Sequence, residues 1–169
     1  VGSEMCIRDS ISNIPAPYRS GQFACLRSRF PKWRVSVLYT GKIEADRVWE
    51  TDEPEENTYF LQSKVLSVKG GEVGGTATRF VHLPKGLFKT LNALKPDVVI
   101  AGEYNFSAVQ ALFWAKAHEI PFVNMTDGTL RSESYIGTVQ KLTRRMIVSG
   151  ADSFLASGTK ACLLYTSPS

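Results

Sequence analysis

The chain has 169 residues, of which 43% are hydrophobic and 21% are charged, and its formal net charge is +4. This composition is that of an ordinary globular domain with a buried core, which excludes disorder along the whole chain. No apolar run approaches the roughly 20 residues that a membrane-spanning helix needs, and the start of the chain lacks the pattern of a secretory signal. We therefore expect a cytoplasmic protein.

The charge is unevenly distributed. Residues 44–56 hold seven acids and one base, so the remainder holds 19 bases and 9 acids, a net charge of +10. A basic surface of this kind suits nucleic acid, anionic lipid or a phosphorylated substrate, and a solvated surface with one acidic loop is the plain alternative. The chain carries no nucleic-acid-binding motif, so no nucleic-acid partner is predicted.

The cysteines indicate neither a disulfide framework nor a metal site. Cys6, Cys25 and Cys162 have no metal-ligand spacing, and an odd number leaves one of them unpaired. We expect free thiols in a reducing compartment, and we predict no metal and no cofactor.

The two ends of the chain look foreign. "VGSEMCIRDS" and "CLLYTSPS" are similar to peptides that arise when sequencing-adapter DNA is translated in assembled environmental reads, and neither has the periodicity of a helix or strand. We expect residues 1–10 and 162–169 to be artefacts and residues 11–161 to form the natural domain, itself a fragment of a longer protein. Ordinary frayed termini are the alternative.

Strands alternate with helices along the remainder. The predicted elements are, in chain order, a helix through 23–30, a strand at 34–39, a hairpin over 65–83, a helix at 87–94, a strand at 97–101, a helix at 106–118, a strand at 121–125 and a helix at 135–149. The residues expected to face inward on the helices are Phe23, Leu26, Phe30, Leu87, Phe88, Leu91, Leu94, Ala108, Val109, Leu112, Phe113, Val139, Leu142, Met146 and Ile147.

This order predicts an α/β fold: a Rossmann-like parallel sheet whose short apolar strands are covered by helices on both faces. Within the hairpin, "KGGEVGG" places glycines where a turn is needed. It lacks the Lys-Ser or Lys-Thr of a phosphate-binding loop, and it does not open a helix.

Ligands of open parallel sheets bind outside the carboxyl ends of the strands. Three predicted loops reach that edge: "NIPAPYRS" at 13–20, "GEYN" at 102–105 and "DGTLRSE" at 127–133. Such polar loops suit a sugar-like or sugar-phosphate ligand, although each residue could equally be a turn, cap or solvated residue. Their polar residues are Asn13, Tyr18, Arg19, Glu103, Tyr104, Asn105, Asp127, Thr129, Arg131 and Ser132.

Several segments carry a resemblance to a known family. "SNIPAPYR", "VLYTGKIEADRVWE", "KPDVVIAGEYNFSAVQALFWAKAHEIPFVNMTDGTLRSE" and "ADSFLASG" resemble the N-terminal domain of family-4 glycosyltransferases, which have the two-domain GT-B fold. The resemblance implies one half of a retaining glycosyltransferase that moves sugar from a nucleotide-sugar donor to a glycan or lipid-linked acceptor. It also implies that the donor binds mainly through a C-terminal domain that this chain lacks, so the chain alone should be inactive.

The resemblance also implies roles for particular residues. Many relatives present a histidine where this chain has Asp127, and we expect this carboxylate to orient a reacting hydroxyl while a donor phosphate oxygen receives the acceptor proton. Arg19 is expected near the donor phosphates, in place of the glycine-rich turn that is common in relatives. The predicted substrate-binding residues are Tyr18, Arg19, Tyr104, Asn105, Gly128, Thr129 and Arg131.

Two further expectations depend on the family. Many relatives work at the inner membrane surface, and Lys141, Arg144 and Arg145 fall on the side of the 135–149 helix away from its apolar stripe, which suits peripheral contact with anionic lipid. A solvated helix face is the alternative. A non-catalytic sugar-binding or regulatory module would show the same loops, whereas a dinucleotide enzyme is disfavoured because the first loop has no Gly-x-Gly-x-x-Gly.

Overall fold

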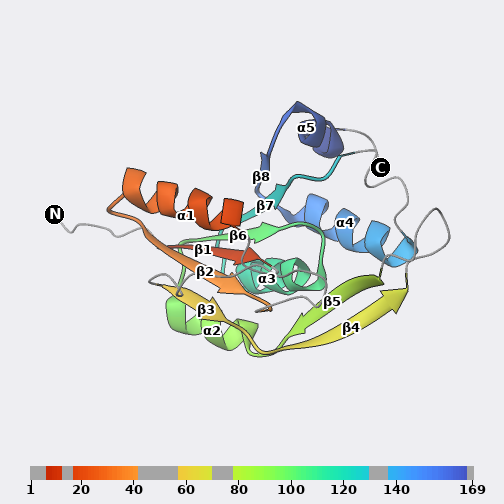
Figure 1. Ribbon diagram of the computed structural model, residues 1–169, viewed down its shortest axis with the longest axis horizontal. Helices are drawn as coiled ribbons and strands as arrows, with labels where there is room; N and C mark the ends of the chain where they lie inside the picture. The colour runs from red at the N-terminus through yellow and green to blue at the C-terminus, as the bar shows by residue number, and fades with distance from the viewer. Residues whose placement is uncertain (1–6, 13–16, 42–56, 70–77, 130–136, 167–169) are drawn as a thin grey trace.

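A computed structural model describes residues 7–12, 17–41, 57–69, 78–129 and 137–166. Its centre is a six-stranded parallel sheet of order β3-β2-β1-β6-β7-β8, beside a separate antiparallel hairpin of β4 and β5 (Figure 1). The predicted parallel α/β sheet and the predicted hairpin are both confirmed. The strands are β1 (Ile7–Ser12), β2 (Arg34–Tyr39), β3 (Thr58–Phe60), β4 (Ser63–Lys69), β5 (Thr78–Pro84), β6 (Val98–Gly102), β7 (Phe122–Thr126) and β8 (Ser153–Ala156).

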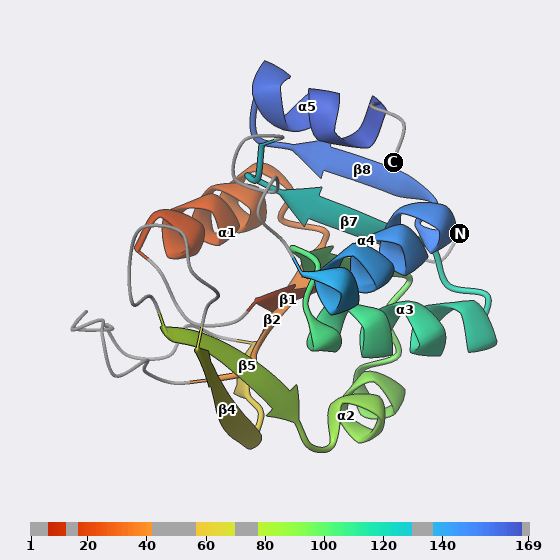
Figure 2. The same cartoon turned by 90° about the vertical axis from the view of Figure 1, so that its right-hand side faces the viewer.

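Helices cover both faces of this sheet, as predicted. Helix α1 lies against one face, and α2, α3 and α4 lie against the other (Figure 2). The core is accordingly divided in two. Phe23 of α1 packs with Val35, Val37 and Tyr39 of β2, while the larger cluster joins α2, α3 and α4 to the opposite face. The helices are α1 (Pro17–Arg29), α2 (Leu87–Leu94), α3 (Phe106–Ala117), α4 (Thr138–Gly150) and α5 (Thr159–Thr166).

The path of the chain creates a switch in strand order at the middle of the sheet. From β1 the chain moves outward to β2 and β3, and it returns through the hairpin and α2 to place β6 on the other side of β1. Helices α1 and α3, which follow β1 and β6 in the chain, accordingly lie on opposite faces of the sheet. In doubly wound sheets this divergence opens the crevice in which ligands bind.

Helix α1 differs from the prediction at both ends. It begins at Pro17, so Tyr18 and Arg19 belong to its first turn and not to a loop. Proline suits the first helical position because its missing amide hydrogen has no partner there anyway. Phe30 lies beyond the helix, because the ring of the following Pro31 disfavours the helical conformation at the residue before it. The Phe30 ring stacks on that of Trp33, with ring centroids 4.1 Å apart.

The inward faces predicted for α2 and α3 were wrong at one phenylalanine each. Leu87 and Leu91 are buried on α2 as expected, but Phe88 is exposed. Likewise Leu112 is buried on α3, whereas Phe113 is exposed. In both helices the phenylalanine is one position, or about 100°, away from a buried leucine, which is enough to turn it to the solvent.

The inward face predicted for α4 is confirmed toward the end of the helix and wrong toward its start. The predicted stripe included Val139 and Leu142, which are 75% and 58% exposed. The side that packs is that of Ile147 and Gly150, because Ile147 is fully buried and the Gly150 Cα faces the side chain of Leu112. Of the predicted inward residues, Ile147 and the half-buried Met146 therefore pack against the core as expected, whereas Val139 and Leu142 do not.

Candidate functional site

The first strand-end loop is only partly described. Residues 13–16 lie outside the described part of the chain, as do Arg131 and Ser132 of the third loop. The backbones of Tyr18 and Arg19 are in α1, directly after the β1 loop, but their side chains are not described. Ligand roles for Tyr18, Arg19 and Arg131 therefore stay predictions.

The turn between β6 and α3 lies at the switch in strand order. Asn105 occupies the N-cap position of α3, where its Oδ1 accepts a hydrogen bond from the Ala108 amide at 2.8 Å. Its Nδ2 donates to the Gly102 carbonyl at 3.3 Å. Both ends of this side chain bond to the backbone, so the cap that satisfies a first-turn amide is its structural role. Its predicted contact with substrate remains a prediction.

Glu103 precedes this cap in an unusual backbone conformation. Its φ is +61°, in the left-handed region that favours glycine. Its amide donates to the Met125 carbonyl at 2.8 Å, which ties the turn to the end of β7. The Glu103 side chain is exposed at the carboxyl edge.

Asn124 of β7 is a structural residue that the sequence reasoning missed. It is fully buried, and its Nδ2 donates to the carbonyls of Ala101 at 3.1 Å and Glu103 at 2.9 Å. A single amide thus holds the β6–α3 turn against the sheet. The available signal was an asparagine inside an otherwise apolar strand, because a buried amide requires partners.

Tyr104 faces α4 and α5. Thr143 Oγ1 donates to the Tyr104 carbonyl at 3.3 Å, and the Arg144 guanidinium carbon lies 5.9 Å from the centroid of the Tyr104 ring. The hydroxyl of Tyr165 donates to Asn124 Oδ1 at 3.1 Å. Burial, together with the neighbouring Tyr104, raises the pKa of Tyr165 above its ordinary value of 10.0, so this phenol keeps its proton in more alkaline solution than a free tyrosine does.

Asp127 follows β7 directly, as predicted, and it is exposed at the carboxyl edge. Thr126 anchors the chain here, because its Oγ1 accepts from the Gly128 amide at 3.0 Å. The Thr126 carbonyl accepts from both the amide and the hydroxyl of Ser157, at 3.1 and 3.2 Å, which joins the ends of β7 and β8. Thr129 is half-buried in the same loop. The Asp127 carboxylate therefore projects from an anchored strand end.

The structure brings together the ends of the β6 and β7 strands. Gly102 pairs with Met125 in the register of these strands, and the amide of Glu103 bonds to the Met125 carbonyl. Tyr104, Asn105, Asp127, Gly128 and Thr129 therefore lie in adjoining loops. Their neighbour Glu103 was predicted to lie in the same polar loop but was not among the predicted substrate-binding residues, and it supplies a second carboxylate at this edge.

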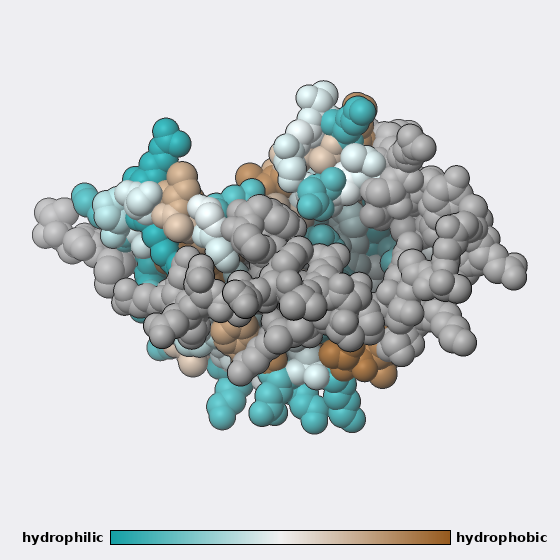
Figure 3. All heavy atoms as spheres, viewed as in Figure 1, coloured by the Kyte–Doolittle hydropathy of each residue, from teal (hydrophilic) through white to brown (hydrophobic). Residues whose placement is uncertain are grey.

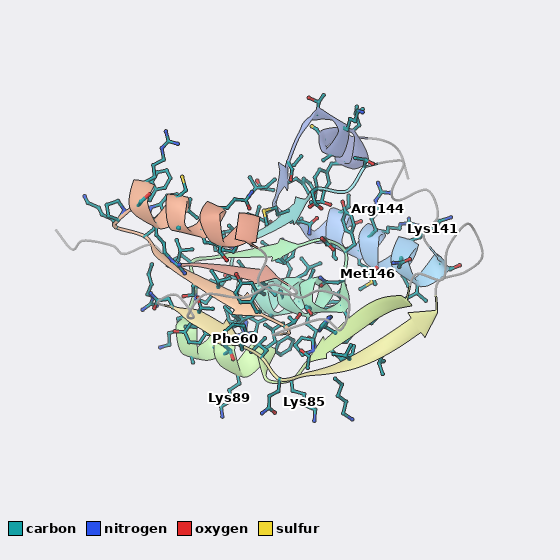
Figure 4. The ribbon with its side chains drawn as sticks, in the orientation of Figure 1. Phe60, Lys85, Lys89, Lys141, Arg144 and Met146 are labelled. Atoms are coloured by element: carbon teal, nitrogen blue, oxygen red, sulfur yellow. The ribbon has the colours of Figure 1, made fainter. Side chains whose placement is uncertain are left out.

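The predicted basic side of α4 is divided. Arg144 is half-buried and turns toward Tyr104, while Lys141 and Arg145 are exposed (Figure 4). Figure 3 shows long hydrophilic side chains on the lower side of the molecule, where Lys85 and Lys89 point away from its body (Figure 4). Exposed bases are therefore present on more than one side.

The described ranges contain neither a candidate metal site nor a candidate membrane-spanning helix. No three His, Cys, Asp or Glu side chains in those ranges are grouped so that they could hold a metal ion. No helix in the same ranges is both long and apolar enough to cross a bilayer.

The sheet order and the helices on both faces define the architecture as one half of a GT-B-like fold. No protein-family model matches the chain, and no curated protein matches it in sequence. Solved structures do match it, at 11–12% sequence identity, which is a likeness of fold alone.

Three of these structures are UDP-N-acetylglucosamine 2-epimerases by description. One from Listeria monocytogenes, described as a candidate enzyme of this kind, has 12% identity and a TM-score of 0.58 over 96% of this chain and 41% of its own. A second has 12% identity and a TM-score of 0.56, and the match covers 98% of this chain and 46% of the other. A third, from Methanocaldococcus jannaschii, has 11% identity and a TM-score of 0.52, and the match covers 96% of this chain and 42% of the other. The chain thus spans less than half the length of each.

Proposed function

We propose that the chain is the N-terminal, acceptor-side domain of a retaining glycosyltransferase that moves a sugar from a nucleotide-sugar donor to a glycan or lipid-linked acceptor. The observation that carries this proposal is Asp127, an exposed carboxylate directly after β7, beside the turn that follows β6. The sequence resemblance supports this reaction class, and one half of a GT-B-like fold is the architecture that the resemblance implies. A second α/β domain, outside this chain, would hold most of the donor.

Asp127 has the role of orienting a sugar hydroxyl. An ionised carboxylate only accepts hydrogen bonds, so it can hold a hydroxyl close to the anomeric carbon, on the face from which the donor phosphate departs in a retaining transfer. The acceptor oxygen forms the new glycosidic bond as the bond to the donor phosphate breaks, and the departing phosphate takes the acceptor proton. Tyr104, Gly128 and Thr129 would surround the sugar, and Arg19 and Arg131 would contact phosphate.

Glycosyl transfer by the full-length parent protein tests this proposal. The protein would be incubated with radiolabelled UDP-N-acetylglucosamine, UDP-glucose or GDP-mannose, together with a membrane lipid extract and soluble oligosaccharides as acceptors. We expect label to move into a lipid or glycan product. Binding of oligosaccharide without transfer from any donor would instead support the non-catalytic sugar-binding module.

An epimerase is the second candidate, because the three matched structures described above are named as epimerases. The same assay separates the two reactions. Conversion of UDP-N-acetylglucosamine to its C2 epimer in the absence of any acceptor would favour epimerisation, and it would count against transfer.

We further propose a cytoplasmic protein in peripheral contact with the inner membrane through Lys141 and Arg145 of α4. Each basic residue near an anionic surface contributes about 1 kcal/mol, and salt screens this attraction. Vesicles of phosphatidylglycerol should therefore bind the protein more strongly than phosphatidylcholine vesicles, and less so in high salt. Equal binding by Lys141→Gln/Arg145→Gln and the parent protein would exclude contact through this face.

A further inference from the structure

Four described residues other than glycine have a positive φ, namely Asn57, Lys95, Glu103 and Glu119. Asparagine tolerates this conformation better than most residues. Lys95 ends α2, with its amide bonded to the Leu91 carbonyl at 2.9 Å. Glu119 follows α3, and the next amide, that of Ile120, bonds to the Ala115 carbonyl at 2.9 Å. Helix ends commonly use a left-handed residue in this way to satisfy their last carbonyls.

Neither the tolerance of asparagine nor a helix end explains the positive φ of Glu103. It follows a strand, and it is not an asparagine or glycine. Its conformation is imposed from both sides: its amide is bonded to the Met125 carbonyl, and its carbonyl accepts from the buried Asn124 side chain. Glycine at this position would have the same backbone without the steric conflict of a Cβ atom. A non-glycine residue held in such a conformation indicates that its side chain has a use.

The position of Glu103 indicates that use. It directly follows β6, next to the switch in strand order between β1 and β6, and its carboxylate is exposed on the ligand edge. Asp127 is the neighbouring carboxylate, at the end of β7. The nearby Arg144 guanidinium is directed at the Tyr104 ring. Two carboxylates repel a phosphate but accept hydrogen bonds from neutral hydroxyls.

We propose that the Glu103 carboxylate binds hydroxyl groups of the sugar at the carboxyl edge of the sheet and makes this part of the edge selective for neutral sugar over phosphate. The inference rests on the proposed function and adds a ligand-binding residue to it. Asn124 acts as a positioning residue, because its amide holds the turn that presents Glu103.

Two variants of Glu103 separate charge from conformation. Glu103→Gln keeps the constrained backbone but removes the charge, whereas Glu103→Gly removes both the side chain and the steric conflict. Glu119→Gly is the matched control, since it relieves the same conformation in the same residue type at the far end of α3. The probes are methyl α-D-glucoside, methyl α-D-galactoside and methyl α-D-mannoside, with uridine monophosphate as a phosphate-bearing control, all followed by NMR shifts of backbone amides.

We expect both Glu103 variants to bind the sugar about tenfold more weakly, the typical effect of losing a hydrogen bond to a charged group. Glu119→Gly should bind the sugar as strongly as the unaltered chain does. Uridine monophosphate should bind Glu103→Gln at least as strongly as it binds the unaltered chain. Each glycine variant should raise Tm by about 2–4 °C, because the steric conflict is gone.

The contrary results are distinguishable. Equal sugar binding by the unaltered chain and both Glu103 variants would overturn the role of Glu103 and leave the proposed function intact. A raised Tm for Glu119→Gly but not for Glu103→Gly would overturn the argument from conformation. No shift with any of the three sugars in the unaltered chain would contradict the proposed acceptor side itself, and the role of Glu103 with it.

Discussion

Asn124 shows how much one buried amide can hold in place. Its side chain donates to the carbonyls of Ala101 and Glu103, and Asn124→Ala would leave both without that partner. We expect the free energy of unfolding to fall by about 2–4 kcal/mol, since unsatisfied buried polar groups cost about 1–3 kcal/mol each. Urea unfolding measures this loss. Met125→Ala, at a half-buried position on the other side of β7, should lose less, and equal losses would contradict the account.

Asp127 is the residue on which the proposed chemistry depends. Asp127→Ala in the full-length enzyme should lower turnover about 100-fold or more, because a hydroxyl that is no longer held beside the anomeric carbon seldom reaches the attacking geometry. The control is Asp97→Ala, which removes an exposed carboxylate from the opposite edge of the sheet. If steady-state kinetics of the two variants are the same, Asp127 is a turn residue only.

Individual residues also show the limits of sequence reasoning. The pattern of an apolar strand followed by Asp-Gly was sufficient to place Asp127 at the carboxyl edge. It could not distinguish a cap from a ligand contact at Asn105, since both uses need a polar side chain after a strand. Nor could it find the conformation of Glu103, which results from contacts with Met125 and Asn124 that are distant in sequence.

Among the helices, two glycines provide a direct test of packing. A Cβ atom at Gly150 would lie 2.9 Å from Leu112 Cδ2, whereas at Gly21 of α1 it would meet nothing within 4 Å. Gly21→Ala should therefore stabilise the protein by about 0.5–1 kcal/mol through helix propensity. Gly150→Ala should destabilise it by about 1–3 kcal/mol through overpacking. Denaturant unfolding that gave the same sign for both would refute this packing of α4 on α3.

Asp152 ties the end of α3 to β7 and β8. Its carboxylate accepts from Lys116 Nζ at 2.7 Å and from the Phe122 amide at 2.8 Å. The Lys116 bond, followed by the Phe122 bond, lowers the pKa of Asp152 below its ordinary value of 3.8. The stabilisation is therefore complete above pH 3.8 and is lost as the pH falls through the lowered pKa.

At neutral pH, Asp152→Asn should lower the free energy of unfolding by about 1 kcal/mol or less, because the pair is almost half exposed and solvent screens it. Urea unfolding at a series of pH values should show the gap between variant and unaltered protein closing below pH 3.8. A gap that stayed constant into strong acid would exclude the ion pair as its cause.

Element prediction succeeded where one local signal was sufficient. The strand at Arg34–Tyr39 matches its prediction because every residue there is apolar or β-branched except Arg34 and Ser36. The inward faces of α2, α3 and α4 were harder to predict, because each helix has more apolar residues than its neighbours can cover. The close approach of Gly150 to Leu112 and the burial of Ile147, for example, both depend on which face of α4 meets α3.

At the scale of the molecule, the composition of β1 supports the proposal that residues 1–10 are foreign. β1 lies between β2 and β6, and its register sets Arg8 beside Val35 and Val98. The central strand of a parallel sheet with helices on both faces is normally apolar. Arg8, Asp9 and Ser10 are unsuited to this place, so we expect the natural strand to be apolar here.

The domain organisation also predicts the behaviour of the isolated chain. It spans less than half the length of the solved structures it matches, and we propose that the donor binds mainly to the other half. The purified chain should therefore transfer no sugar from a nucleotide-sugar donor, even if it binds a glycan. Donor-dependent transfer by the chain alone would refute this division of the site.

The central claim is that this chain is one domain of a two-domain glycosyltransferase, and the parent DNA tests it most directly. Amplifying outward from the codons for Asn13 and Thr159, and sequencing across both ends, gives the natural reading frame. We predict an apolar strand in place of residues 7–10 and, downstream, a second α/β half. The family-4 resemblance implies that this donor-binding half carries two glutamates in Glu-x7-Glu spacing. A native frame that encodes Arg8-Asp9-Ser10 and stops after Ser169 would contradict the account and favour a lone binding module.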